Sequence, residues 1–232
     1  EIGLVKLYCL TGAKKYLDQA KFFLDQRGNS QGHKLYGFYS QDHLPVTQQT
    51  EAVGHAVRAA YMYSAMTDVA ALTGDEAYVQ ALRKLWEDVV FRKMYLTGGI
   101  GSTGAWEGFG PAYNLPNGSA YCETCASIAN AFWNYRMYLL EGDAKYLDVF
   151  ERIIYNGVLS GISLSGDRFF YANPLASFGQ HERTPWFGCA CCPPNIARFL
   201  PQMGQYVYAT SGDRLFVNLY GASSSQVEVN GL

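Results

Sequence analysis

The chain has 232 residues, of which 49% are hydrophobic and 16% charged, and its formal net charge is −2. This length and composition are typical of a globular protein with one large domain or two small ones. No basic run indicates binding to nucleic acid, and no apolar run reaches the roughly 20 residues of a membrane span. No charged and apolar leader opens the chain, so we expect a cytoplasmic protein, and the start without Met inside a helical pattern suggests that the natural N-terminus is missing.

The first two predicted helices form a hairpin. Apolar residues recur at helical spacing from Ile2 to Leu10 and again from Lys14 to Asp25. A short Thr-Gly-Ala segment separates the two runs, and Gly28 follows the second as a helix stop signal. We therefore expect two short antiparallel helices at the start of the chain.

The turn of this hairpin recurs twice. A glycine followed four residues later by a tyrosine occurs at Gly12, Gly74 and Gly142, with spacings of 62 and 68 residues. A period of this size, made of two helices and a long loop, predicts stacked helical hairpins. Alanine-rich first helices favour an inner position for the first member of each pair. The predicted helices of the later copies cover residues 51–72 and 75–93, and residues 123–140 and 143–159.

Three long linkers, residues 28–50, 94–121 and 160–192, hold most of the Gly, Pro, Asn and aromatic residues. In a toroid of hairpins such loops gather at one end, where functional residues are usually found. A further helix is predicted over residues 194–208, and alternating segments from Arg214 to Tyr220 and from Gln226 to Asn230 indicate strands. The prediction is a mainly α protein, with helical hairpins in residues 1–210 and the start of a β-strand module in residues 211–232.

Five of the six cysteines lie in two short motifs. Cys189, Cys191 and Cys192 stand within four residues, and Cys122 and Cys125 flank a glutamate. Adjacent cysteines rarely form a disulfide with each other, because the eight-membered ring that such a bond closes is strained. Neither motif has the spacing of a small disulfide scaffold. Tetrahedral zinc accepts both Cys and Glu ligands. The two motifs therefore predict either one zinc site or a group of buried, inert thiols.

Other candidate residues are less specific. The run from Gly99 to Gly104 matches G-x-G-x-x-G, but it follows a helix and precedes a loop, so it does not predict a dinucleotide site. Glu107 follows a tryptophan, and a partly desolvated carboxyl group can act as a general acid; a solvated loop carboxylate is the alternative. His55, on an alanine-rich helix, is either a packing or a catalytic histidine. Cys9 is expected in the core.

Four motifs follow one another along the chain: Trp106-Glu-Gly-Phe109, Tyr121-Cys-Glu-Thr-Cys125, Phe169-Phe-Tyr-Ala-Asn-Pro174 and Trp186-Phe-Gly-Cys-Ala-Cys-Cys-Pro-Pro-Asn195. In this order they resemble the β-L-arabinofuranosidases of glycoside hydrolase family 127. The similarity extends to Tyr206-Val-Tyr-Ala209 and Leu215-Phe-Val-Asn-Leu-Tyr220, so it covers nearly the whole chain.

The resemblance implies an (α/α)6 barrel and a retaining glycosidase that releases β-L-arabinofuranose from plant-type arabino-oligosaccharides or glycoproteins. It also implies a zinc ion held by Glu123, Cys125, Cys191 and Cys192. By the same resemblance Cys191 is the nucleophile, Glu107 is the general acid/base, and His55 and Tyr171 line the sugar subsite. A zinc-bound thiolate suits this role because the metal keeps it deprotonated at neutral pH.

Members of that family are several hundred residues long, with more helices before this chain and β-sandwiches after it. The chain has about seven predicted helices against the twelve of a closed (α/α)6 barrel. We therefore expect an incomplete barrel, completed by a second copy or by missing parts of a longer chain. Two alternatives remain open: a toroid glycosidase with two carboxylates and structural thiols, and a zinc-stabilised carbohydrate-binding or inactive fragment. The expected partner is a carbohydrate, not nucleic acid or a membrane.

Overall fold

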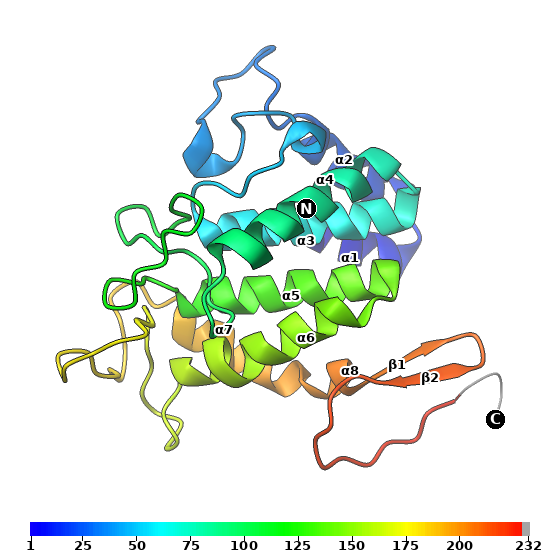
Figure 1. The fold of residues 1–232 in the computed structure, drawn as a ribbon. Helices are drawn as coiled ribbons and strands as arrows, with labels where there is room; N and C mark the ends of the chain where they lie inside the picture. The colour runs from blue at the N-terminus through cyan, green and yellow to red at the C-terminus, as the bar shows by residue number, and fades with distance from the viewer. Residues whose placement is uncertain (229–232) are drawn as a thin grey trace.

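The computed structural model describes residues 1–228 and consists mainly of helical hairpins (Figure 1). Three hairpins follow one another along the chain, as the repeated turn predicts. Their helices are α1 (Ile2–Thr11) with α2 (Lys14–Asp25), α3 (Ala56–Thr73) with α4 (Glu76–Asp88), and α5 (Thr124–Glu141) with α6 (Ala144–Arg152). Most ends lie within one or two residues of the predicted ones; the larger differences are the start of α3 and the ends of α4 and α6.

The repeated glycines end the first helix of each hairpin. Gly12, Gly74 and Gly142 have φ angles of 68°, 71° and 72°, the left-handed conformation that glycine adopts with little strain. In the second and third hairpins an aspartate then begins the next helix, because the side chains of Asp75 and Asp143 each accept a hydrogen bond from the amide two residues on. The sequence repeat thus corresponds to a repeated helix-turn-helix unit.

Helices α3 and α5 lie at the centre of the molecule and pack along each other, with α1 against α3 and α7 (Cys192–Phe199) against α5. Their contact is close because the alanines of both helices, except Ala71, are buried. Tyr63 and Trp133, both fully buried, meet between them with ring centroids 4.8 Å apart. Helix α4 packs outside, where the Trp86 indole donates a hydrogen bond of 2.8 Å to Asn134 of α5. The predicted inner position of α3 and α5 is confirmed.

The long loops gather at one side of the helices, together with the N-terminal ends of α3, α5 and α7 (Figure 1). The first linker contains two short 3-10 helices, Phe38–Ser40 and Val46–Gln48. The other two linkers follow π-helical turns, Val89–Lys93 after α4 and Ile153–Val158 after α6, the second of which continues into the 3-10 turn Leu159–Gly161. The predicted clustering of the loops is confirmed, and it places their side chains beside three helix starts.

The C-terminal region differs from the prediction. The single helix expected over residues 194–208 is divided into α7, a 3-10 turn (Leu200–Gln202) and α8 (Gly204–Val207). Pro201 lies at the division, where its missing N–H disfavours a continuous helix. An unpredicted strand β1 (Tyr208–Ser211) pairs antiparallel with β2 (Arg214–Val217), so the strand expected over residues 214–220 is shorter than predicted. A second strand was expected over residues 226–230. Residues 226–228 form no strand, and residues 229 and 230 lie outside the described residues.

Helix α1 is more exposed than the sequence suggested. Val5 is the residue that it buries, and Cys9, expected in the core, is exposed. The expectation for Cys9 was wrong because apolar spacing alone does not show how much of a helix its neighbours cover. None of the described helices is both long enough and apolar enough to cross a lipid bilayer.

Candidate active site

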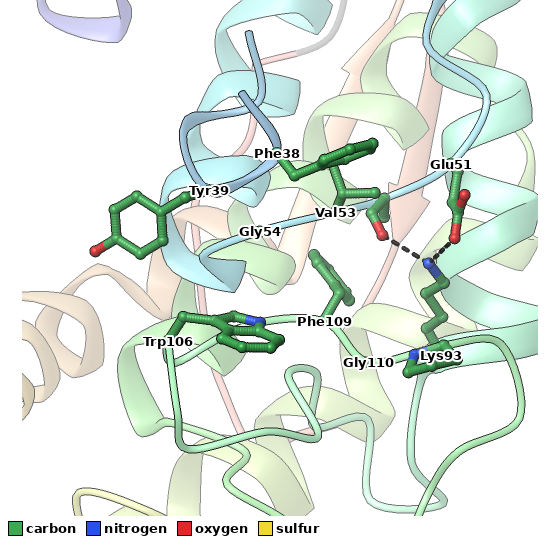
Figure 2. A pocket seen from close by; sticks show the side chains of 11 residues that line it. Phe38, Tyr39, Glu51, Val53, Gly54, Lys93, Trp106, Phe109 and Gly110 are labelled. Carbon is green, nitrogen blue, oxygen red and sulfur yellow. Dashed lines mark hydrogen bonds and ion pairs between the residues drawn. The ribbon is translucent and has the colours of Figure 1, made fainter. Parts of the chain in front are cut away.

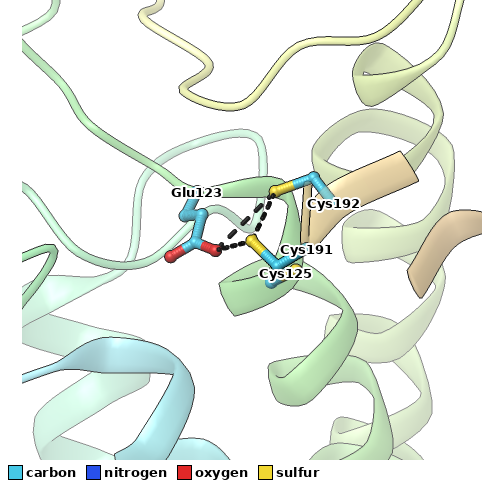
Figure 3. A group of neighbouring side chains, drawn as sticks. All are labelled: Glu123, Cys125, Cys191 and Cys192. Carbon is cyan, nitrogen blue, oxygen red and sulfur yellow. Dashed lines mark hydrogen bonds between the residues drawn. The ribbon is translucent and has the colours of Figure 1, made fainter. Parts of the chain in front are cut away.

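Two motifs that are far apart in the sequence meet at the N-terminal ends of α5 and α7. Glu123 directly precedes α5, whose first turn holds Cys125, while Cys191 precedes α7, which begins at Cys192. One donor atom from each of these four residues lies within 4.8 Å of the others (Figure 3). Cys191 is partly open to solvent, and the other three residues are buried. The structure therefore brings together the four residues expected to bind a metal.

The spacing of these donor atoms suits a tetrahedral ion. The sulfur atoms of Cys191 and Cys192 are 3.6 Å apart, and Glu123 Oε1 lies 3.3 Å from the first and 3.7 Å from the second. Tetrahedral zinc with Zn–S bonds of about 2.3 Å requires S···S separations of about 3.8 Å and S···O separations of about 3.5 Å. In addition, Glu123 Oε2 is buried and has no hydrogen-bond partner among residues 1–228. The donor set and its spacing fit a thiophilic metal.

The clustered groups shift one another's pKa values. Hydrogen bonds from Cys125 and Cys192 lower the pKa of Cys191, and the Tyr171 hydroxyl adds to this effect. The hydrogen bonds to Cys125 and Cys191 raise the pKa of Cys192. Burial, followed by the charge of Cys191, raises the pKa of Glu123 to about 8. Negative charge is therefore concentrated on Cys191, the least buried residue of the four.

Two tyrosines connect the thiol cluster to Glu107. The Tyr171 hydroxyl lies 3.1 Å from Cys191 Sγ and can donate to the thiolate, while the Tyr121 hydroxyl donates a hydrogen bond of 2.9 Å to Glu107 Oε1. The two rings are neighbours, with centroids 6.2 Å apart. Burial raises the pKa of both phenols, so both remain protonated donors at neutral pH.

The backbone holds Glu107 in an unusual conformation. Its φ angle is 53°, a left-handed value that is uncommon for residues other than glycine. Its carbonyl accepts a hydrogen bond of 3.0 Å from the first amide of α3, at Ala56. The Glu107 side chain contacts Tyr121 and His55. The sequence predicted aromatic surroundings for the carboxyl group from its neighbour Trp106, but this indole is 52% exposed. The carboxyl group is therefore positioned by hydrogen bonds more than by the adjacent indole.

His55 lies immediately before α3, not within a helix as predicted. Gly54 has a φ angle of 70°, and a Cβ atom there would collide with the Phe38 carbonyl, so the helix begins only after His55. His55 Nε2 lies 3.1 Å from Glu107 Oε2. Burial lowers the pKa of His55 and outweighs the opposing effect of Glu107, so the neutral ring donates through Nε2. Its Nδ1 atom is buried without a partner among residues 1–228.

A cavity of about 490 Å³ is lined by sequence neighbours of Glu107 and His55, although not by these two residues themselves (Figure 2). Its wall includes Trp106 and Gly54, which directly precede these two residues, and the Tyr39 ring, whose centroid lies 5.9 Å from that of His55. An ion pair between Lys93 and Glu51 closes one side (Figure 2). The remaining lining is mainly apolar, from Phe38, Ala52, Val53, Phe109, Gly110 and Pro111.

All the site residues singled out in the sequence lie in one neighbourhood. Donor atoms of His55, Glu107 and Glu123 lie within 4.8 Å of one another, and Glu123 also belongs to the thiol cluster. Sequence reasoning missed Tyr121, whose hydroxyl donates a hydrogen bond to Glu107. This tyrosine opens the motif that holds Cys122 and Cys125, so proximity to those cysteines was the available signal.

Comparison with known proteins gives consistent results. A family profile described as the catalytic domain of β-L-arabinofuranosidases of glycoside hydrolase family 127 matches residues 1–205. A non-reducing end β-L-arabinofuranosidase of Bifidobacterium longum subsp. longum is 37% identical over 237 aligned residues, which cover 90% of this chain and 36% of that protein.

Two solved structures are also similar. A β-arabinofuranosidase of family 127 has 58% identity and a TM-score of 0.96, covering 99% of this chain and 36% of that chain. A family 127 β-L-arabinofuranosidase from Geobacillus stearothermophilus T6 has 45% identity and a TM-score of 0.93, covering 99% of this chain and 40% of that chain. The chain thus spans between a third and two fifths of the length of these relatives.

Proposed function

The chain belongs to the β-L-arabinofuranosidases of glycoside hydrolase family 127, and from this premise we propose that it carries the reaction centre of a retaining glycosidase releasing β-L-arabinofuranose. Plant-type arabino-oligosaccharides or glycoproteins are the proposed substrates. The observation that carries the proposal is a chain of contacts between two groups. Tyr171 lies within hydrogen-bond distance of the partly exposed Cys191 thiol, Tyr121 donates to the Glu107 carboxyl group, and the two tyrosine rings are neighbours.

Zinc is the metal that we propose for the thiol cluster. Three thiolates with one carboxylate favour zinc over magnesium or calcium, which prefer oxygen ligands. Glu123, Cys125, Cys191 and Cys192 would hold the ion, and the unpartnered Oε2 atom of Glu123 supports this assignment. When bound, zinc would supply the positive charge that keeps the thiols deprotonated at neutral pH.

In the proposed first step, the Cys191 sulfur attacks the anomeric carbon, and a carbon–sulfur bond forms as the bond to the leaving oxygen breaks. Glu107 gives its proton to that oxygen. In the second step, Glu107 takes a proton from water, whose oxygen displaces the sulfur and releases the sugar with its configuration retained. Tyr121 and His55 hold the Glu107 carboxyl group, and His55 and Tyr171 would line the sugar subsite.

A glycosidase with two carboxylates is the second candidate, because Glu107 and Glu123 have oxygen atoms within 4.8 Å of each other. Retaining enzymes place such a pair about 5–5.5 Å apart. However, burial raises the pKa of Glu123 to about 8, so without a metal this carboxyl group is mostly protonated at neutral pH and is a weak nucleophile. Glu123 is also only 2% exposed, whereas Cys191 is partly open, and we therefore favour the thiol.

We propose that residues 1–210 form a portion of an (α/α)6 barrel and that residues 211–232 begin a β-strand module. The row of α1, α3, α5 and α7, with α2, α4 and α6 packed outside, supports this arrangement. The remaining helices of such a barrel would come from a second copy of this chain or from other parts of a longer chain.

Metal analysis tests the zinc assignment. Protein purified without chelator should contain about one zinc per chain with Zn–S distances near 2.3 Å, measurable by X-ray absorption spectroscopy. Removal of the metal should lower the melting temperature, because a ligand bound at about 100 times its Kd stabilises the folded state by about 2.7 kcal/mol. A protein free of zinc and of any other thiophilic metal would rule out the assignment.

Activity measurements on protein that contains residues 1–232 test the roles of the two reacting groups. With an aryl β-L-arabinofuranoside, Glu107→Gln should lower turnover by on the order of 10² or more, and Cys191→Ser should abolish it. Cys189→Ser is the matched control, because this thiol is exposed and lies outside the cluster. Near-normal hydrolysis by Cys191→Ser, with loss of activity in Glu123→Gln, would return the nucleophile to a carboxylate.

A further inference from the structure

Asn173 connects two segments that carry residues of the site. Its side-chain amide donates hydrogen bonds to the Cys122 carbonyl at 2.8 Å and to the Thr124 hydroxyl at 3.0 Å. Its backbone amide donates to the Tyr121 carbonyl at 2.8 Å, and the Thr124 amide donates to the Tyr171 carbonyl at 2.9 Å. The segment around Glu123 is thus held to the segment that presents Tyr171, through contacts centred on one side chain.

The orientation of the Asn173 amide is fixed by its partners. Its nitrogen faces a carbonyl oxygen, which can only accept, and its Oδ1 atom accepts a hydrogen bond of 3.0 Å from the Ser160 hydroxyl. Thr124 Oγ1 accepts from Asn173 and donates to the Phe170 carbonyl at 2.8 Å, so its rotamer is fixed as well. An amide with donors on one side and an acceptor on the other is required at this position.

The residue that Asn173 contacts is strained. Cys122 has a φ angle of 41°, a left-handed conformation that costs of order 1–3 kcal/mol in a residue other than glycine. Its amide donates to the Gly101 carbonyl at 2.8 Å, and its carbonyl accepts from Asn173. This conformation turns the chain into α5 and directs Glu123 toward the thiols. Loss of the Asn173 contact would allow the peptide to relax and Glu123 to turn away.

We propose that Asn173 is a positioning residue, which holds Cys122 and Thr124 so that Glu123 and Cys125 face Cys191. The inference rests on the proposed function only in its consequence for metal binding and hydrolysis. It assigns Asn173 no contact with the sugar or the metal. Removing hydrogen-bond partners behind metal ligands typically lowers metal affinity or activity by about 10- to 100-fold, which sets the expected effect.

Two substitutions with a matched control separate positioning from general packing. Asn173→Ala removes both donors, and Asn173→Asp keeps the shape but places a second acceptor against the Cys122 carbonyl, so its effect should be at least as large. Ser160→Ala is the control, because it removes the bond to Oδ1 and leaves both donated bonds intact. Cobalt(II) titration, followed by thiolate-to-metal absorption, should show affinity lowered by about 10- to 100-fold in both Asn173 variants and within about threefold of wild type in the control.

A second measurement needs no metal. In metal-free folded protein, alkylation of Cys125, which is 4% exposed, should be at least about tenfold faster in the Asn173 variants, because the start of α5 is released. Cys192 on α7 should stay protected, since it lies outside the segment that Asn173 holds. Cobalt affinity within threefold of wild type, or equal exposure of Cys125 and Cys192, would overturn the inference. If wild-type protein binds neither zinc nor cobalt, the proposed metal site fails and the alkylation comparison alone decides the role of Asn173.

Discussion

The buried ion pair beside the cavity makes a sharp stability prediction. The Lys93 ammonium group donates to the Ala52 carbonyl at 2.7 Å and to Glu51 at 2.8 Å, and it lies 3.5 Å from Asp88 Oδ2. The side chains of Lys93 and Asp88 are only 3% and 5% exposed, and Asp88 also accepts from the Ala52 amide at 2.8 Å. These contacts join residues 51 and 52, which shortly precede His55, to the end of α4.

Lys93→Met keeps the length of the side chain and removes the buried cation beside Asp88, whose remaining cationic neighbour is the exposed Arg92, with Nη1 3.9 Å from Oδ1. Removing one partner of a buried ion pair costs about 3–5 kcal/mol. Asp88→Asn should cost about 1–3 kcal/mol, because Lys93 keeps its contacts with Glu51 and Ala52. The double variant should cost less than the sum of the two single changes, since no unpaired charge remains buried.

Urea unfolding followed by circular dichroism gives the three free energies, provided that the slope m stays constant. At about 2–4 °C per kcal/mol for a chain of this size, Lys93→Met should lower the melting temperature by roughly 6–20 °C. Lys84→Met is the control on the exposed side of α4, with an expected change within about 0.5 kcal/mol. Additive costs in the double variant, or a cost below about 1 kcal/mol for Lys93→Met, would show that the pair is not coupled.

Three further predictions concern the site. Tyr171→Phe removes a hydrogen bond to a charged sulfur worth about 1.5–3 kcal/mol, so kcat/KM should fall by roughly 10- to 100-fold. The lowered pKa of His55 means that the unfolded chain binds more protons below about pH 6.5, so stability should fall there as pH decreases, and fall less in His55→Gln. Glu107→Gly should unfold at a higher temperature than Glu107→Ala, because glycine removes a left-handed strain of about 1 kcal/mol.

Each of these has a direct check. The kinetic prediction needs an aryl β-L-arabinofuranoside assay, and an unchanged kcat/KM would mean that the Tyr171 hydroxyl does not act on the sulfur. For His55, parallel curves of melting temperature against pH for wild type and variant would contradict the assigned shift. For Glu107, equal stability of the glycine and alanine variants would show that the left-handed conformation carries no strain in the folded protein.

The repeated helices could be predicted from sequence because local chemistry determines them. Gly12, Gly74 and Gly142 each end a helix in the conformation that glycine favours, and the alanine-rich helices are central. The strand β1 (Tyr208–Ser211) was missed because its partner strand, not its own pattern, stabilises it. His55 was placed on a helix because the collision that stops the helix at Gly54 involves Phe38, a residue from another loop.

For the site, the sequence indicated the residue types but not their supports. The cysteine motifs and the family resemblance singled out Glu107, Glu123 and Tyr171, and the fold brings these together with the thiols. Tyr121 and Asn173 could not be assigned in this way, because their contacts join segments about fourteen and fifty residues apart and depend on how the long loops pair. Side chains that act through another residue leave no spacing pattern in a single sequence.

The strained backbone shows why these supports are needed. Glu107 and Cys122 both have left-handed φ angles. Glu107 is the proposed general acid/base, and Cys122 directly precedes the proposed metal ligand Glu123. A residue other than glycine keeps such a conformation only where its surroundings determine it, and here hydrogen bonds to Ala56, Gly101 and Asn173 do so. The two strained residues thus support Glu107 and Glu123, whose carboxyl groups have oxygen atoms within 4.8 Å of each other, and Glu123 in turn belongs to the thiol cluster. The strain lowers the stability of the folded protein, but the same conformations fix the groups that would bind metal and transfer protons.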